Sequence, residues 1–118
     1  MNIGIDMIEI SRFIDIENNK DMMNDIFTKN EQKYITSKNN NAETISGIYA
    51  AKEALLKAIK KDINKYKLND IEINHDKNNA PYITLYNDIL NDYKDSKFEV
   101  SISHDIDYVV AVVIDIKK

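Results

Sequence analysis

The sequence has no cysteine, one proline and only two glycines, Gly4 and Gly47. The absence of cysteine excludes a disulfide framework, a thiolate metal site and a cysteine nucleophile, and it is typical of proteins in the reducing cytoplasm. No apolar stretch reaches the roughly 20 residues that a membrane span needs, since the longest, from Tyr108 to Ile114, has the length of a strand. The first residues, MNIGIDMIEI, lack the basic start and long apolar run of a signal peptide. We therefore expect a soluble cytoplasmic protein that does not bind a membrane.

Basic and acidic residues are unevenly distributed along the chain. The net charge of −4 argues against a general nucleic-acid binder, so we expect no nucleic-acid partner. The segment from Lys52 to Lys67 nevertheless contains six lysines and only two acidic residues, Glu53 and Asp62. A compact basic segment in an acidic chain suits a small polyanion such as a polyphosphate, and the alternative is a solvated, lysine-rich helix end.

We expect one domain over residues 1–118, because no Gly/Ser-rich linker, repeat or long charge block divides the chain. A capping box from Thr28 to Glu31 marks one helix start, and Asn40 with Glu43 marks the next. The expected elements are a strand over 3–10, helices over about 11–18, 21–27, 28–36 and 42–61, a hairpin over 71–85, a helix over 86–93, and strands over 98–103 and 108–116. This order predicts a mixed α+β domain with largely antiparallel strand pairing.

The segment from about Ala42 to Lys61 has the strongest helix signal, because its apolar residues recur at the spacing of one helix face. We expect any chemistry on a different face of this helix. That face carries Tyr49, Glu53, Lys57 and Lys60. Lys52 lies within the apolar arc, where we expect its stem to pack while its ammonium reaches outward.

Three groups are candidates for chemistry. Asp6 is a carboxylate inside an apolar strand, where an unpaired charge is costly, although it could also face solvent or accept backbone hydrogen bonds. Glu53 lies mid-helix with Lys57 one turn later, and the alternative is a surface ion pair. His104 ends a strand before a turn, as many functional residues do, and could equally be a turn residue. His75, in the predicted hairpin, is interpreted as having no function.

Together these residues suit metal-dependent phosphoryl-type transfer. Asp6 and Glu53 are carboxylates from different elements. Such a pair suits an Mg²⁺ ion whose remaining ligands are water and phosphate oxygens. Nearby lysines neutralise the charge of a pyrophosphate or of a leaving phosphate.

Five motifs resemble those of the holo-[acyl-carrier-protein] synthases, in that family's order and across nearly the whole chain. The motifs are GIDMIEISRF at 4–13, FTKNE at 27–31, AAKEALLKA at 50–58, APY at 80–82, and SISHD at 101–105 with YVVA at 108–111. The resemblance implies the 4′-phosphopantetheinyl transferase fold, with a largely antiparallel sheet packed on a long central helix. It implies an Mg²⁺-dependent transferase of fatty acid (lipid) biosynthesis, which moves 4′-phosphopantetheine from coenzyme A to a serine of apo acyl carrier protein and releases 3′,5′-ADP.

The resemblance also implies roles for single residues. Asp6 and Glu53 match the metal-binding carboxylates, Glu53 also helps to deprotonate the attacking serine, and Lys57 stabilises the leaving phosphate. The residues implied in binding coenzyme A are Lys57, Lys60, Lys61, Ala80, Pro81, His104 and Asp105. Those implied in binding the carrier protein are Arg12, Phe13 and Lys20. The carrier-facing helices keep only Arg12 and Lys20 as basic residues among acidic neighbours, so we expect carrier docking either to be weaker than in relatives or to depend more on apolar contacts such as Phe13, Met22 and Met23. Short family members form homotrimers with active sites between subunits, so a homotrimer is implied here.

The chain departs from the family pattern in two places near the long helix. Ile48-Tyr49 stands where the family usually has Arg-Phe. The chain therefore lacks an arginine that is expected to bind a phosphate of coenzyme A. Lys60-Lys61-Asp62 replaces the usual Gly-rich stretch, and we hypothesise that the lysines supply charge in place of glycine amides. If the chain does not transfer phosphopantetheine, the alternative functions are a metal-dependent phosphoesterase and a non-catalytic binding module.

Overall fold

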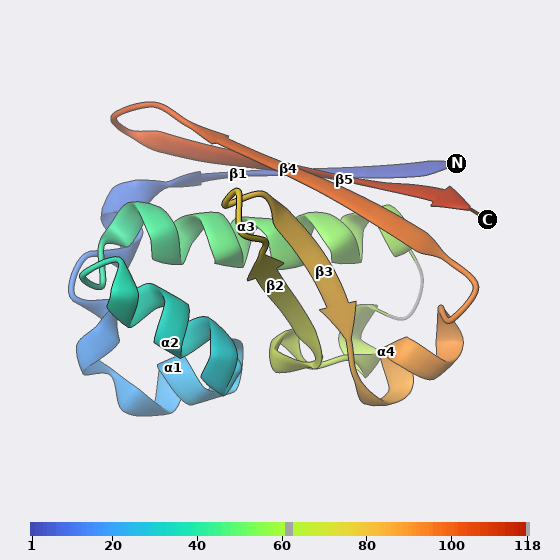
Figure 1. Ribbon diagram of the computed structural model, residues 1–118, viewed down its shortest axis with the longest axis horizontal. Coiled ribbons are helices and arrows are strands. Elements are labelled where there is room, and N and C mark those ends of the chain that lie inside the picture. Colours follow the sequence, from blue (N-terminus) through green and yellow to red (C-terminus); the bar gives the residue numbers. More distant parts are fainter. Residues whose placement is uncertain (61–62, 118) are drawn as a thin grey trace.

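The computed structural model describes residues 1–60 and 63–117 and confirms an α+β fold (Figure 1). Its strands are β1 (Asn2–Glu9), β2 (Ile71–His75), β3 (Pro81–Leu85), β4 (Lys97–His104) and β5 (Tyr108–Lys117). Its helices are α1 (Lys20–Ile26), α2 (Lys29–Ser37), α3 (Ala42–Ile59) and α4 (Asn87–Asp92). Short 3-10 turns are η1 (Ile10–Phe13), η2 (Ile16–Asn18), η3 (Ile63–Lys65) and η4 (Leu68–Asp70). No helix within the described ranges is long and apolar enough to cross a membrane.

All described strand pairs are antiparallel, as predicted. One sheet has the order β1-β5-β4, and β2 with β3 forms a separate hairpin. In Figure 1 the three-stranded sheet covers one side of α3, and α1, α2 and α4 lie on the opposite side, while the β2–β3 hairpin crosses in front of the helix and its β3 contacts β4. The long helix is therefore central, and its residues meet both layers.

Glycine allows β1 to pass unusually close to α3. A Cβ at Gly4 would overlap the carbonyl oxygen of Ala54 and lie 2.5 Å from the backbone nitrogen of Ala58. Side chains alternate across a strand, so Asp6 and Ile8 lie on the same face as Gly4 and point toward α3. The close approach thus brings the Asp6 carboxylate to the middle of the long helix.

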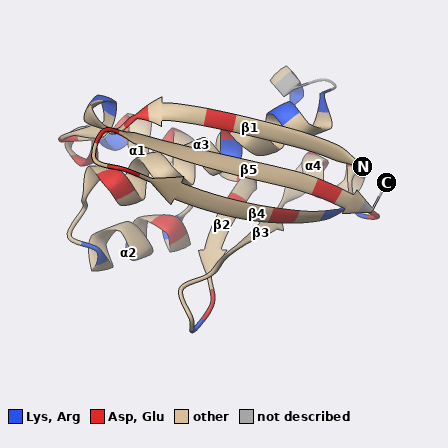
Figure 2. Cartoon of the chain, turned by 90° about the horizontal axis from the view of Figure 1, so that it is seen from above, with Lys and Arg blue, Asp and Glu red and all other residues tan. Residues whose placement is uncertain are grey.

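The face of β1 that points away from α3 is apolar and exposed. On β1, Ile3, Ile5 and Met7 are 57%, 58% and 67% exposed. Figure 2 looks down on this sheet, where β1, β5 and β4 carry only isolated charged positions. An exposed apolar patch of this kind is typical of a protein interface.

Local capping signals set most helix boundaries, with two corrections to the sequence predictions. Thr28 and Glu31 form the predicted capping box of α2. The cap of α3 is Asn41, whose side chain accepts from the backbone N–H of Thr44 at 2.7 Å, and not Asn40. The helix predicted over 11–18 is instead η1 and η2, because Asp15 between them has a φ of 64° that no helix tolerates.

The prediction that the Lys52 ammonium reaches outward is wrong, because it points inward. It is fully buried and forms an ion pair with Glu31 at 2.6 Å. The same ammonium donates to the carbonyl oxygens of Ile26 (2.6 Å) and Leu68 (2.9 Å). Glu31 in turn accepts from the backbone N–H of Ile73 at 2.6 Å. A buried charge needs such complete pairing, so this network fixes α3 against α1, α2, η4 and β2.

A second buried carboxylate, Glu72 of β2, joins its own strand to two other segments. It accepts hydrogen bonds from the side chains of Thr28 (2.6 Å), Asn74 (2.9 Å) and Tyr86 (2.8 Å). Burial alone would raise the pKa of Glu72, but these hydrogen bonds outweigh burial and hold its pKa below the ordinary value. The network ties the start of α2 to the hairpin and to the residue that precedes α4.

Candidate active site

Asp6 and Lys57 meet where β1 crosses α3. The Lys57 ammonium lies 2.8 Å from Oδ1 of Asp6, and the Asp6 side chain is only 13% exposed. The other oxygen, Oδ2, is buried and has no hydrogen-bond partner among the described residues. The structure therefore brings together two of the three residues predicted to be catalytic, and it leaves one carboxylate oxygen available to a ligand.

Glu53 lies one helical turn before Lys57 and is partly buried. Its carboxylate interacts with the hydroxyl of Tyr49, one turn earlier again. Burial raises the pKa of Tyr49, and the neighbouring carboxylates of Glu53 and Asp6 raise it further, whereas Arg12 lowers it. Asp6 and Glu53 therefore both lie close enough to the Tyr49 hydroxyl to act on it electrostatically.

The donor set of this site fits Mg²⁺. Magnesium prefers carboxylate oxygens and is usually held by one or two carboxylates, with water and substrate phosphates completing the octahedron. Asp6 offers the unpartnered oxygen Oδ2, and Glu53 offers a second carboxylate. Within residues 1–60 and 63–117 there is no cluster of three or more His, Cys, Asp or Glu side chains that could cage a metal ion. The site therefore suits an ion that shares its coordination with a substrate.

Two of the predicted carrier-binding residues, Arg12 and Phe13, lie next to Tyr49 of this site but differ in exposure. Phe13 packs against Tyr49 with ring centroids 5.2 Å apart, and the exposed Arg12 lies 6.0 Å from the Phe13 ring. Phe13 and Met23 are core residues with 4% and 6% exposure, so they are not apolar surface contacts as predicted. Met22 is 41% exposed and is available at the surface.

Two of the residues predicted to bind coenzyme A border a cavity at the other end of α3. The cavity has a volume of about 200 Å³ and is lined by Pro81 from β3 and His104 from β4. His104 Nδ1 lies 3.1 Å from Oε2 of Glu43, in the first turn of α3. The cavity also borders Ile48, which the sequence marked as a departure from the family pattern.

None of the other described coenzyme A candidates lines this cavity. Ala80 is held in the hairpin turn, where its N–H donates to Asp76 at 3.0 Å. Asp105 shapes the β4–β5 turn by accepting from the N–H groups of Asp107 (2.8 Å) and Tyr108 (2.7 Å), which lower its pKa. Lys60 is exposed at the end of α3, and Lys61 lies outside the described residues.

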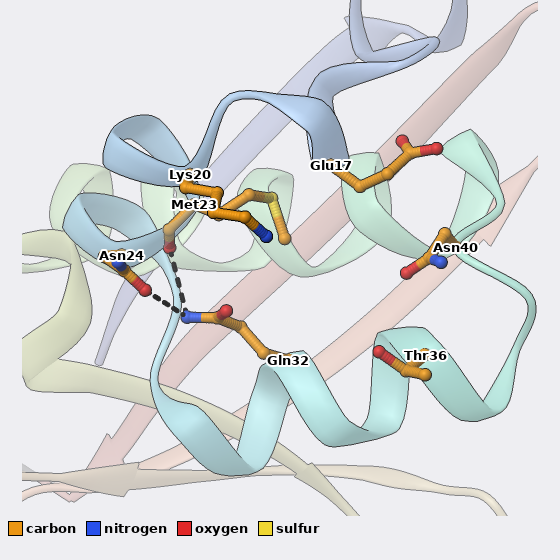
Figure 3. Close-up of a pocket in the computed structure, with 7 residues that line it drawn as sticks. All are labelled: Glu17, Lys20, Met23, Asn24, Gln32, Thr36 and Asn40. Atoms are coloured by element: carbon orange, nitrogen blue, oxygen red, sulfur yellow. Dashed lines mark hydrogen bonds between the residues drawn. The ribbon is translucent and has the colours of Figure 1, made fainter.

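A second cavity, of about 300 Å³, lies between η2, α1 and α2 (Figure 3). Its lining includes Lys20, a predicted carrier-binding residue, together with Glu17. Figure 3 shows the amide of Gln32 turned toward Asn24, to whose Oδ1 it donates at 3.1 Å. None of the metal or coenzyme A candidates that the structure describes lines this cavity.

Within one chain the predicted site therefore falls into two groups. Asp6, Glu53 and Lys57 lie along the second half of α3, whereas Pro81 and His104 border a cavity at its first half. The sequence analysis missed Tyr34, Thr44 and Asn79, which also line the cavity. The turn-forming pattern around Asn79 gave no sign of that role, because only the tertiary structure brings the hairpin to α3.

Comparisons with known proteins agree with the sequence motifs. Residues 2–113 match the family model of the 4′-phosphopantetheinyl transferase superfamily. The holo-[acyl-carrier-protein] synthase of Caldicellulosiruptor saccharolyticus is 41% identical over 116 residues, which cover 96% of this chain and 94% of that protein. The enzyme of the same name from Alkaliphilus oremlandii is 42% identical over 118 residues, with 97% of each chain covered.

Solved structures share the fold at lower identity. The Helicobacter pylori holo-[acyl-carrier-protein] synthase in complex with coenzyme A has a TM-score of 0.82 and 28% identity, covering 96% of this chain and 98% of that chain. A holo-(acyl-carrier-protein) synthase from Bacillus anthracis, in complex with CoA (3′,5′-ADP), has a TM-score of 0.78 and 30% identity, covering 95% and 92%.

Proposed function

The chain belongs to the 4′-phosphopantetheinyl transferase superfamily, and from this premise we propose that it acts as a holo-[acyl-carrier-protein] synthase. It transfers 4′-phosphopantetheine from coenzyme A to a serine of apo acyl carrier protein and releases 3′,5′-ADP. The observation that carries the proposal is the paired Asp6 and Lys57 beside Glu53, with one carboxylate oxygen left unpartnered. The role in fatty acid biosynthesis is typical of the family, and the cytoplasmic location stays a prediction.

The residues of the site divide the chemistry of transfer between them. The serine oxygen forms a bond to the phosphorus that carries pantetheine, and the bond from that phosphorus to the bridging pyrophosphate oxygen breaks. Glu53 accepts the serine proton, and the electron pair of the broken bond leaves with 3′,5′-ADP. The half-exposed Lys57 ammonium lies beside Asp6, where it stabilises charge on the leaving phosphate.

Magnesium is the metal that this site suits, with Asp6 and Glu53 as its protein ligands. When bound, Mg²⁺ neutralises charge on the pyrophosphate. The pairing of Asp6 Oδ1 with Lys57 fixes the orientation of the Asp6 carboxylate, so that Oδ2 is the oxygen offered to the metal.

A homotrimer would bring the two groups of site residues together across a subunit boundary. Two observations support it: the metal candidates and the coenzyme A cavity lie at different halves of α3, and the outer sheet face presents Ile3, Ile5 and Met7 to solvent. Burying such a face is strongly favourable, at roughly 25 cal/mol per Å² of apolar surface. Arg12 and Lys20, both exposed, are the proposed basic contacts to the carrier protein.

The decisive test is the intact mass of a purified apo acyl carrier protein after incubation with the chain, coenzyme A and Mg²⁺. We expect a gain of one phosphopantetheine, which a chelator abolishes. Glu53→Gln should slow transfer by about two orders of magnitude or more, because a general base typically contributes that much.

Asp95→Asn, which changes an exposed carboxylate outside the site, is the matched control and should keep wild-type activity. No mass gain with several carriers would overturn the proposal. Release of phosphate from coenzyme A without modification of the carrier would instead indicate a phosphoesterase.

A further inference from the structure

Tyr49 of α3 adds a hydroxyl group to the candidate metal site. It lies one helical turn before Glu53, and both side chains are partly buried. Side chains of a helix lean toward its amino-terminal end, so the side chain of Glu53 extends back toward Tyr49. The Glu53 carboxylate accepts a hydrogen bond from the Tyr49 hydroxyl. The pair therefore joins a candidate metal ligand to a neutral donor on the same helix.

The ring of Tyr49 is held in place by η1, the 3-10 turn that follows β1. Phe13 of η1 is a core residue, and its ring centroid lies 5.2 Å from that of Tyr49, with 48° between the two planes. The turn itself is anchored, because the backbone N–H of Ile10 donates to the carbonyl oxygen of Asp107 at 2.8 Å. A ring packed on a core residue has few rotamers available. The hydroxyl is therefore held beside Glu53 from outside the helix as well as by the helix itself.

Each carboxylate of the site then has its own orienting donor. Lys57 donates to Oδ1 of Asp6 at 2.8 Å, and Tyr49 donates to Glu53. Carboxylates that bind metal ions are commonly hydrogen-bonded in this way, because the outer partner fixes the direction of the ligand oxygens. Loss of such a partner typically weakens metal binding or activity by about 10–100-fold.

The packing of Tyr49 does not account for its hydroxyl. The contact with Phe13 needs only a ring, which the phenylalanine usual in the family at this position would also supply. A partly buried hydroxyl costs free energy unless it is hydrogen-bonded, and Glu53 is its partner here. The hydroxyl is therefore the part of this side chain that acts on the site.

We propose that Tyr49 is a positioning residue, whose hydroxyl orients the Glu53 carboxylate for the metal ion. The inference rests on the proposed function and adds a residue to which the sequence assigned no role. A carboxylate that is already fixed in direction loses less conformational entropy when the ion binds, so the hydroxyl strengthens metal binding.

The test measures metal affinity without turnover. Mn²⁺ is the probe, because it shares the preference of Mg²⁺ for oxygen ligands, and the EPR signal of the free ion reports how much is bound. The full chain is saturated with coenzyme A, and carrier protein is left out. Tyr49→Phe keeps the ring beside Phe13 and removes only the hydroxyl, so we expect the dissociation constant of Mn²⁺ to rise about tenfold.

Transfer kinetics provide a second readout of the same variant. The Mg²⁺ concentration that gives half-maximal rate should rise by a similar factor in Tyr49→Phe, whereas the rate at saturating Mg²⁺ should stay close to that of wild type. Tyr66→Phe is the matched control, because it removes a hydroxyl that donates to another carboxylate, that of Asp92, at 2.6 Å. This pair joins η3 to α4 outside the candidate site, so Tyr66→Phe should leave the affinity for Mn²⁺ unchanged.

Two results would overturn the inference while the wild type still modifies the carrier, in which case the proposed function stands. Unchanged Mn²⁺ affinity in Tyr49→Phe would mean that the residue only packs, and equal weakening in Tyr66→Phe would mean that a lost hydroxyl acts through general destabilisation. Weaker Mn²⁺ binding in Tyr49→Phe alone, with no carrier modification by the wild type, would support the inference and overturn the proposed function. A wild type that neither binds Mn²⁺ with coenzyme A nor modifies the carrier would overturn both.

Discussion

At the scale of single residues, the two lysines of the AAKEALLKA motif have opposite roles. Lys52 is fully buried against Glu31, whereas Lys57 is 55% exposed and paired with Asp6. Helical periodicity correctly put them on different faces of α3, but it predicted an outward ammonium for Lys52. The reason for the error is tertiary: the carboxylate and carbonyl groups that satisfy Lys52 come from α2, α1 and η4, which no local pattern places around it.

Asp6 shows the complementary case, in which the sequence was sufficient to identify a candidate. A carboxylate within an isoleucine-rich strand is costly unless it is paired, and the structure pairs it with Lys57. The sequence could not indicate which carboxylate oxygen would stay free, because that depends on the angle at which β1 crosses α3. That angle depends on the close approach at Gly4.

Glu72 provides a pH-dependent prediction at the same scale. Its folded pKa lies below the ordinary value of 4.5, so its stabilising contribution is present above that pH and is lost as the pH falls through the folded pKa. Glu72→Gln should therefore lower the free energy of unfolding by about 1–3 kcal/mol at pH 7. The difference between wild type and variant should shrink as the pH drops below 4.5. Urea denaturation at pH 7 and pH 3.5 measures both, and a difference independent of pH would contradict the assignment.

At the scale of elements, helix and strand positions were largely predictable because their signals are local. The capping box of α2, the apolar periodicity of α3 and the turn-rich residues between β2 and β3 all act within a few residues. The prediction over 11–18 failed because Asp15 adopts a left-handed conformation, which its sequence neighbours do not require. The cap of α3 was misplaced by one residue because Asn40 and Asn41 are chemically identical candidates.

The end of α3 allows a test of backbone strain. Lys60 ends the helix with a φ of 62°, a conformation that glycine adopts without strain and lysine does not. Lys60→Gly should raise the free energy of unfolding by about 0.5–1 kcal/mol, measured by urea denaturation. Lys33→Gly, in the middle of α2, is the matched control and should lower it by about 1 kcal/mol. A destabilised Lys60→Gly variant would contradict this reading of the helix end.

At the scale of the whole molecule, the proposed trimer would link the site to the assembly. The metal candidates and the cavity bordered by Pro81 and His104 lie at different halves of α3, and the exposed sheet face of Ile3, Ile5 and Met7 is the surface most suited to association. The isoleucine-rich sequence predicted a strand at β1 but not which of its side chains face solvent. It could not predict how the two groups of site residues would combine in the proposed trimer, because that would depend on contacts between chains.

A charge on the sheet face tests this link. Met7→Glu should reduce the mass in solution, measured by light scattering, from three chains of 13.7 kDa toward one. Transfer activity should fall at least tenfold, because a partner chain no longer completes the site. Lys94→Glu adds the same side chain at an exposed position away from the sheet and should change neither quantity. A wild-type mass of one chain with full activity would rule out the trimer.

The pairing of β1 with β5 affects when the protein can fold during its synthesis. The register joins Asn2 to Asp115 and Glu9 to Tyr108, so β1 cannot pair until β5 has also left the ribosome (Figure 1). Contacts so distant in sequence form slowly, and unpaired strand edges are prone to aggregation. The nascent chain therefore carries an apolar, unpaired β1 until β5 has been made. Asp6 reaches Lys57 in its final position only after β5 has paired with β1.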